Sequence, residues 1–259
     1  MRTFASAVLV ACALAAPGAA QFFASGDDAH VGVDGAWWTP ELDSEIQISD
    51  DIKGTSLSLE DDLGVDDEDI PWGSLWFQFS PKNKLTFSYF TVGYEGDVPL
   101  TKNITFEDKT YNLNTRVESN LDLDVYEMEY LHMFGDPGMV RFGFLVGVKV
   151  FDVYAAIAGT EATTGVYEKA EEDVMFPLPQ VGAVVKFVFG DIFTVTAKGS
   201  GIGVASDQVF YDASALIGVE TKYVGVMGGY RIINLDVEAD DDAVNLEMSG
   251  PAAVVSLRF

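Results

Sequence analysis

The chain has 259 residues, and its 41 Asp and Glu residues outnumber its 15 Lys and Arg residues, which gives a net charge of −26 at pH 7. Nucleic acid is excluded as a partner, because binding to phosphates needs clustered Lys and Arg side chains. A disordered acidic chain is excluded too, because such chains lack apolar residues, whereas 48% of this chain is hydrophobic and it contains 18 Phe.

The first 20 residues predict a secretory signal peptide. Arg2 gives a short positive start, 4–16 are apolar, and small residues at 18–20 provide a cleavage site. We therefore expect a mature chain of 21–259. The single cysteine, Cys12, would leave with the signal peptide, so the mature chain would have no disulfide and no thiolate ligand for a metal. The sequence at 9–12 also resembles a lipoprotein box, which would instead leave a lipidated Cys12.

After Gln21 the chain repeats segments of about ten residues in which apolar side chains alternate with polar or small ones. This period of two indicates β-strands. No later stretch reaches the roughly 18 uninterrupted apolar residues of a membrane-spanning helix. We expect ten strands, with eight or twelve as alternatives, over 30–38, 72–80, 84–94, 121–134, 139–154, 177–189, 192–202, 209–221, 224–236 and 248–259.

The connections between these strands alternate in length. Tight turns are expected at 81–84, 135–138, 190–191 and near 222–223, and long connections at 39–70, 95–118, 157–175, 203–208 and 238–247. Short turns on one side and long loops on the other are typical of a bacterial outer-membrane barrel, whereas a soluble β-sandwich has no reason to sort its loops by length. The expected fold is all-β: a transmembrane antiparallel up-and-down β-barrel over 21–259 with acidic extracellular loops.

Each strand places its charged residues on one face only, which predicts a charged lumen. If Glu127 and Glu129 point inward, alternation sends Asp122 and Asp124 outward, where they must stand above the hydrocarbon. The inward charges have two interpretations, a salt-bridge network that stiffens a packed barrel or the lining of a narrow channel. The candidate lumen residues are Glu127, Glu129, Arg141, Lys149, Lys186, Lys198, Asp212, Glu220, Arg231 and Arg258.

The last strand, which ends in Phe259, resembles the C-terminal signature by which Gram-negative outer-membrane barrels are recognised for assembly. The segments 57–66, 81–89 and 228–237 are similar to a widespread group of uncharacterised, porin-like proteobacterial outer-membrane β-barrel proteins. The resemblance covers nearly the whole mature chain. It implies a location in the bacterial outer membrane, with outer-membrane lipid, lipopolysaccharide and the barrel-assembly machinery as partners. The resemblance does not indicate which substrate, if any, the protein has, and it does not indicate the oligomeric state.

Two acidic clusters stand out, one at 41–69, where Lys53 alone opposes twelve acids, and one at 236–242. One interpretation is the capture of Ca²⁺ or Mg²⁺ by oxygen ligands; the other is a hydrated surface that needs no cofactor. The EF-hand spacing with its central Gly is missing. The candidate metal ligands are Asp61, Asp62, Asp66, Asp67, Asp240, Asp241 and Asp242.

Catalysis finds little support in the sequence. Enzymes of this barrel type generally use a His on the outer rim to activate a nucleophile or water. Both histidines, His30 and His132, are expected at the opposite end, beside the short turns. We therefore expect a non-enzymatic barrel with a structural or surface-interaction role. The rivals are a narrow channel for small solutes or ions and a rim-active enzyme that hydrolyses lipid or peptide.

Overall fold

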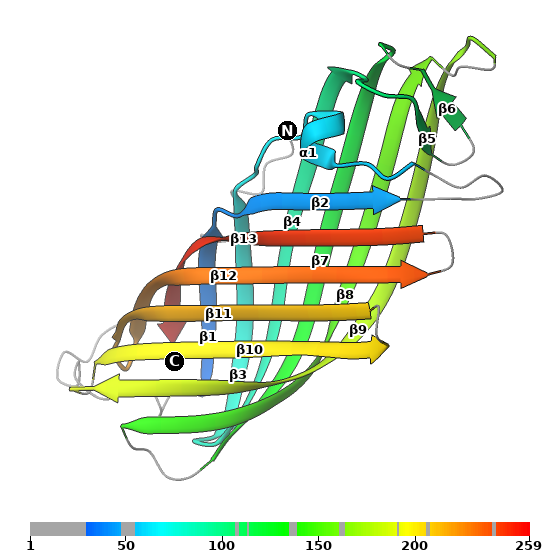
Figure 1. Cartoon of the computed structure of the whole chain (residues 1–259). Helices are drawn as coiled ribbons and strands as arrows, with labels where there is room; N and C mark the ends of the chain where they lie inside the picture. The colour runs from blue at the N-terminus through cyan, green and yellow to red at the C-terminus, as the bar shows by residue number, and fades with distance from the viewer. Residues whose placement is uncertain are drawn as a thin grey trace.

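The alternating segments form a closed barrel of ten antiparallel strands (Figure 1). The computed structural model describes residues 30–47, 55–106, 109–112, 114–134, 139–160, 164–190, 192–205, 208–239 and 242–259. In order around the barrel the strands are β1 (Val31–Trp38), β3 (Ile70–Ser80), β4 (Asn83–Pro99), β7 (Arg116–Phe134), β8 (Val140–Thr160), β9 (Tyr167–Phe189), β10 (Phe193–Ala205), β11 (Gln208–Glu220), β12 (Val224–Ala239) and β13 (Asp242–Arg258).

The barrel closes between its first and last strands. β1 pairs with β3 on one side and with β13 on the other, with Gly32 opposite Arg258 and Trp38 opposite Ala252. The predicted count of ten strands and the up-and-down order are thereby confirmed. No helix in the described part of the chain is long and apolar enough to cross a membrane.

The turn end of the barrel, where the connections are short, is built as the sequence predicts. β3 and β4 are joined at 81–82. Gly190, after β9, has a φ of 57°, a left-handed conformation that glycine adopts without steric penalty. Before β12, the Thr221 backbone N–H donates to the Val224 carbonyl at 2.8 Å. The predicted turn at 135–138 lies outside the described residues.

At the opposite, loop end, the predicted long connections at 157–175 and 238–247 are wrong, because the strands continue through most of both ranges. β8 runs to Thr160 and β9 starts at Tyr167, while β12 runs to Ala239 and β13 starts at Asp242. These strand ends lack the apolar alternation used to recognise strands. A ladder of backbone hydrogen bonds does not require apolar side chains, so the strands extend beyond their apolar sections.

One part of the loop end is closed by a helix instead of a strand. β2 (Glu41–Gln47) follows β1 along β13, but β3 begins only at Ile70, opposite Trp38. The upper part of β4, at 91–99, pairs with β7 alone. The short helix α1 (Leu59–Leu63) packs against both β2 and β4 in this gap (Figure 1). A small hairpin of β5 (Ile104–Phe106) and β6 (Lys109–Tyr111) completes this end.

The outer surface carries a band of exposed apolar side chains around the turn-end half of the barrel. We call this band the apolar belt. Aromatic side chains lie near the strand ends that border it, among them Trp37, Phe79, Phe134, Phe193 and Phe259. An outward apolar band flanked by aromatic residues is typical of barrels that face lipid. The belt includes Val33, Leu75, Phe87, Met128, Phe142, Val146, Val181, Ile217, Val226 and Val255.

Candidate functional site in the barrel lumen

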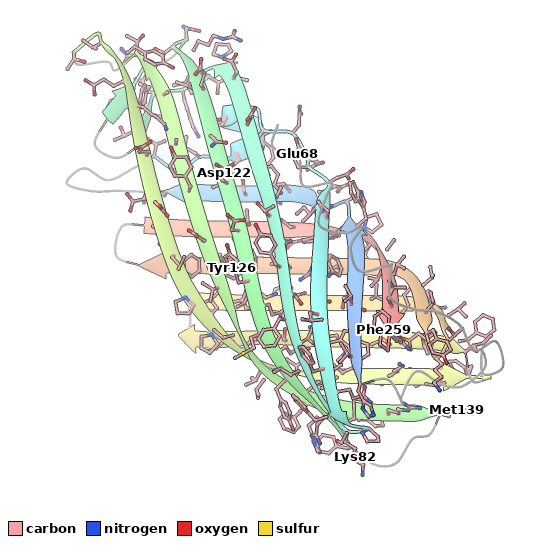
Figure 2. The ribbon with its side chains drawn as sticks, turned by 180° about the vertical axis from the view of Figure 1, so that it is seen from behind. Glu68, Lys82, Asp122, Tyr126, Met139 and Phe259 are labelled. Atoms are coloured by element: carbon pink, nitrogen blue, oxygen red, sulfur yellow. The ribbon has the colours of Figure 1, made fainter. Side chains whose placement is uncertain are left out.

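The faces of β7 follow the predicted alternation. Glu127 and Glu129 line the lumen, while Asp122 and Tyr126 are exposed on the outer wall (Figure 2). Asp124 also lies on the outer face, where its Oδ1 accepts a hydrogen bond of 2.6 Å from the Tyr89 hydroxyl. The period of two therefore separates a charged lumen from the outer surface on the same strand.

Asp212 is the centre of the charged lumen. Its Oδ2 lies 2.5 Å from the Lys149 Nζ and 2.8 Å from a terminal nitrogen of Arg231. Lys149 is fully buried and also lies 3.6 Å from Glu127 Oε1. The Arg231 guanidinium lies 5.0 Å from the centre of the Trp38 ring and 4.7 Å from that of Trp72, within the range of cation–π attraction. Four strands are joined through these charges.

Two further ion-paired groups lie nearer the turn end. Lys198 Nζ is 2.5 Å from Glu129 Oε2, a contact that joins β10 to β7 across two intervening strands. Glu220 pairs with both Lys186 and Arg258. Glu127, Glu129, Asp212 and Glu220 therefore each meet at least one cation, which is the condition for keeping buried charges ionised.

The structure thus brings nine of the ten candidate lumen residues into ion pairs, and Arg141 lines the same cavity. Sequence reasoning missed Gln180, whose Nε2 donates to Glu127 at 2.5 Å and whose Oε1 accepts from the Ser200 hydroxyl at 2.9 Å. Asp34 and Lys84 were missed as well, although both occupy positions at which the side chains of their strands point into the lumen. The alternation of side-chain direction along each strand would have placed all three side chains in the lumen.

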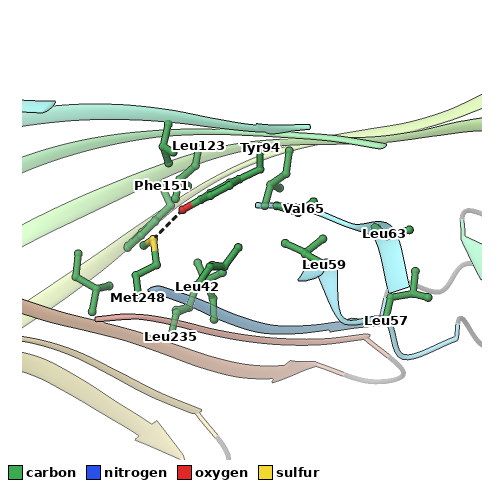
Figure 3. Packing of buried hydrophobic residues seen from close by; sticks show 14 of the residues in the cluster. Leu42, Leu57, Leu59, Leu63, Val65, Tyr94, Leu123, Phe151, Leu235 and Met248 are labelled. Carbon is green, nitrogen blue, oxygen red and sulfur yellow. Dashed lines mark hydrogen bonds between the residues drawn. The ribbon is translucent and has the colours of Figure 1, made fainter. Parts of the chain in front are cut away.

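The loop-end half of the lumen is different, because apolar side chains fill it (Figure 3). Tyr94, Leu123 and Phe151 project from three different strands, and the Tyr94 hydroxyl donates to the sulfur of Met248 at 3.7 Å. Phe151 stacks on Phe176 with 5.4 Å between ring centres. We call this packing the loop-end core. Its members include Trp38, Leu42, Phe90, Tyr94, Leu121, Leu123, Val125, Phe151, Ile233, Leu235 and Met248.

The helix α1 covers the loop-end core with Leu59 and Leu63. Ser58 caps the helix by accepting from the Asp61 N–H at 3.1 Å. Ser44 of β2 then ties the helix to the wall, since its hydroxyl accepts from the Leu59 N–H at 3.2 Å and donates to Glu60 at 3.0 Å. On the other side, a Cβ added to Gly96 would meet the Leu63 carbonyl oxygen at 2.1 Å, so the helix and β4 need glycine there.

A cavity of about 300 Å³ lies below the loop-end core. Its lining runs from Lys82 and Asn83, at the β3–β4 turn, up to Phe90 and Val125. Phe90 and Val125 belong to the loop-end core. The cavity therefore reaches the turn end of the barrel and meets the apolar packing at its other limit.

The acidic candidates for a metal site that fall within the described residues do not converge. Asp62 pairs with Lys102 at 2.7 Å and accepts from the Ser58 N–H at 3.0 Å, while Asp67 accepts from the Leu42 N–H at 2.8 Å. Asp61 and Asp66 are exposed. Asp240 and Asp241 lie outside the described residues, and Asp242 is the first residue of β13. Within the described ranges, no three His, Cys, Asp or Glu residues are arranged to hold a metal ion.

Both histidines lie at the turn end. His30 Nδ1 is 3.3 Å from the Gln78 carbonyl oxygen, and His132 Nδ1 is 2.7 Å from Asn83 Oδ1. The His132 ring also packs against Phe134. Phe259 helps to close the seam between the first and last strands, because its N–H donates to the Val31 carbonyl at 2.8 Å and its carbonyl accepts from the His30 N–H at 2.9 Å.

No model of a known protein family matches the sequence, and no curated protein sequence matches it. Solved structures do match. The outer membrane protease OmpT from Escherichia coli superposes with a TM-score of 0.61 at 10% identity, over 91% of this chain and 98% of that chain. The translocator domain of the autotransporter NalP from Neisseria meningitidis gives 0.47 at 10% identity, over 90% and 89%. The Pseudomonas putida toluene transporter TodX gives 0.36 at 10% identity, over 90% of each chain. At these identities the likeness concerns the fold, and the fold of this chain is that of the bacterial outer-membrane β-barrels.

Proposed function

We propose that this chain is an integral outer-membrane barrel whose lumen is closed to solutes, and that it has a non-enzymatic structural or surface-interaction role. The observation that carries the proposal is the loop-end core. Side chains from opposite walls meet there, and Trp38, Phe151, Ile233 and Met248 have no exposed surface. Protein interiors pack about as densely as organic crystals, so such a core leaves no room for a water-filled path.

The strand number supports the same proposal. Small barrels fill their interiors with side chains, and an aqueous channel is found in much wider ones. Below the core, the paired charges of Asp212, Lys149 and Arg231 bind the walls to one another. Such a network resists widening, since separating any pair would leave a buried charge without its partner.

A surface role is supported by the uneven height of the wall. β7, β8 and β9 have 19, 21 and 23 residues, whereas β10 and β11 have 13 each. A strand needs about 9–11 residues to cross a bilayer, so the three longer strands project well beyond it at the loop end. The projecting faces carry polar contacts, including a hydrogen bond of 2.8 Å from the Tyr154 hydroxyl to Glu171.

Location and partners are part of the proposal. The apolar belt fits lipid and the acyl chains of lipopolysaccharide, and the strand that ends in Phe259 would be read by the barrel-assembly machinery. OmpT is a protease by its name, but we propose no such activity here. This chain has two histidines, and each contacts residues of the turn end, far from the projecting wall.

Conductance in a planar lipid bilayer tests the closed lumen. We expect no steady current steps from the unmodified protein. The double variant Tyr94→Ala and Phe151→Ala should open a leak, because it removes two large side chains from the loop-end core. Phe142→Ala, on the lipid-facing side of β8, is the matched control and should remain closed. The second candidate, a narrow channel, is favoured by the charged cavity, and steady, salt-dependent conductance of the unmodified protein would establish it.

A further inference from the structure

The turn-end half of the lumen concentrates positive charge in a strongly acidic protein. Besides Lys82 in the β3–β4 turn, seven of the chain's 15 Lys and Arg residues lie in this half, namely Lys84, Arg141, Lys149, Lys186, Lys198, Arg231 and Arg258. Five described acids face them: Asp34, Glu127, Glu129, Asp212 and Glu220. Even without Lys82 and Arg141, six cations face five acids.

One of these cations, Lys84, stands outside the ion pairs. Lys84 lines the cavity and lies within electrostatic reach of Lys186 and Lys198 as well as of Asp34 and Glu129. Among the described residues its Nζ makes no ion pair or hydrogen bond, and it lies over the face of the Trp76 ring, 5.6 Å from the ring centre. Lys84 therefore brings into the cavity an ammonium group that no carboxylate of the described residues contacts at ion-pair distance.

The neighbouring acids are already engaged. Asp34 accepts hydrogen bonds from the Ser74 hydroxyl at 3.0 Å and from the Trp76 indole N–H at 3.2 Å. Glu129 is paired with Lys198 at 2.5 Å, and Glu220 with two cations. If one of these carboxylates moved to pair with Lys84, it would lose its present hydrogen bonds or ion pairs. The barrel wall therefore supplies no counter-ion for Lys84 without a loss of stability.

We infer that the cavity binds a small oxyanion, of the size and charge of inorganic phosphate, against the ammonium group of Lys84. The cavity volume of about 300 Å³ far exceeds the roughly 10–15 Å³ that one water requires, so a hydrated anion fits. The ligand enters from the turn end, because the loop-end core closes the other limit. Ammonium groups bind phosphate as point charges, and the low dielectric of the barrel walls strengthens the attraction.

Isothermal titration of the refolded mature chain in detergent micelles, at low ionic strength and free of phosphate and sulfate, tests the site. We expect saturable binding of one inorganic phosphate per chain. Lys84→Gln should weaken the affinity at least tenfold, and Lys84→Arg should retain most of it. Lys222→Gln, in the β11–β12 turn at the same end of the barrel, is the matched control and should bind as the unmodified protein does. Chloride at equal ionic strength should compete poorly.

Folding does not confound this test. Lys84→Gln removes no ion pair or hydrogen bond made with described residues, and circular dichroism together with heat-dependent gel migration should match those of the unmodified barrel. Absence of saturable phosphate binding would overturn the inference, and so would equal affinities of Lys84→Gln and Lys222→Gln. A barrel that conducts would refute the closed lumen but leave the anion site standing, so the two proposals fail separately.

Discussion

The two halves of the lumen are lined by the same strands, yet they are held together by different forces. On β7 the inward positions change from Leu121, Leu123 and Val125 to Glu127 and Glu129 within a few residues. The loop-end half gains stability from each apolar side chain removed from water, at roughly 25 cal/mol per Å². In the turn-end half, the attraction between charges mainly offsets the loss of their hydration. Truncating one apolar side chain in the loop-end half should therefore lower the stability by a graded amount. The turn-end half, in contrast, is stable only while each buried charge keeps its ion-pair partner.

The largest expected effect is the loss of Asp212. Asp212→Ala leaves Lys149 and Arg231 without their shared acceptor, and removing one partner of a buried ion pair lowers the free energy of unfolding by about 3–5 kcal/mol. Urea unfolding of the barrel in lipid vesicles measures this change in the free energy of unfolding. Combining Asp212→Leu with Lys149→Met, Arg231→Met and Glu127→Gln should recover most of the loss, because apolar or neutral replacement of a whole buried set is often tolerated, and Glu127 must be included since its cation is Lys149. A quadruple variant no more stable than Asp212→Ala would contradict this view of the turn-end half.

A smaller loss is expected in the loop-end core. Leu123→Ala removes apolar volume from a buried position and should lower the free energy of unfolding by about 3 kcal/mol, from lost burial and the remaining cavity. The same unfolding experiment measures this loss. Met128→Ala, which faces outward on the same strand, is the control and should have a clearly smaller effect. Equal losses at the two positions would show that the loop-end half is not a packed core.

The smallest effect is expected for a charge pair in solvent. Arg116 donates two hydrogen bonds of 2.7 Å to Asp97 on the projecting wall, and these lower the pKa of Asp97. A depressed carboxyl pKa stabilises the fold above the unfolded-state pKa, and this stabilisation is lost as the pH falls through the folded-state pKa. Arg116→Gln should return the Asp97 pKa toward its ordinary value, as measured by carbon NMR titration, with little change in stability at neutral pH. A large loss of stability would mean that exposed pairs matter as much as the lumen network.

The alternation of side-chain direction along each strand was enough to predict the barrel and its charged lumen. It predicted ten strands and placed Glu127 and Glu129 inside with Asp122 and Asp124 outside, because side-chain direction alternates strictly along a strand. It could not give the partner of each charge. Lys198 meets Glu129 across two intervening strands, and that encounter depends on the tilt and stagger of the whole barrel.

The loop-end core was missed for another reason. A period of two reports which residues share a face, but it does not say which faces meet across a lumen. Leu59 and Leu63 lie in a predicted acidic loop, where the carboxylates around them suggested a hydrated surface. In the structure these leucines cover the core from a helix of five residues, whose short length hides its apolar stripe.

The seam between β1 and β13 also constrains how the chain can assemble. The His30 N–H and the Phe259 carbonyl meet at 2.9 Å, although these residues stand 229 positions apart (259 minus 30). Contacts so distant in sequence form slowly, because the loop must close before the contact can stabilise it. Until Phe259 has been synthesised, the growing sheet has two open edges that can pair with other chains. The barrel can therefore close only after the whole of β13 has been made, and until then its open strand edges need protection from pairing with other chains.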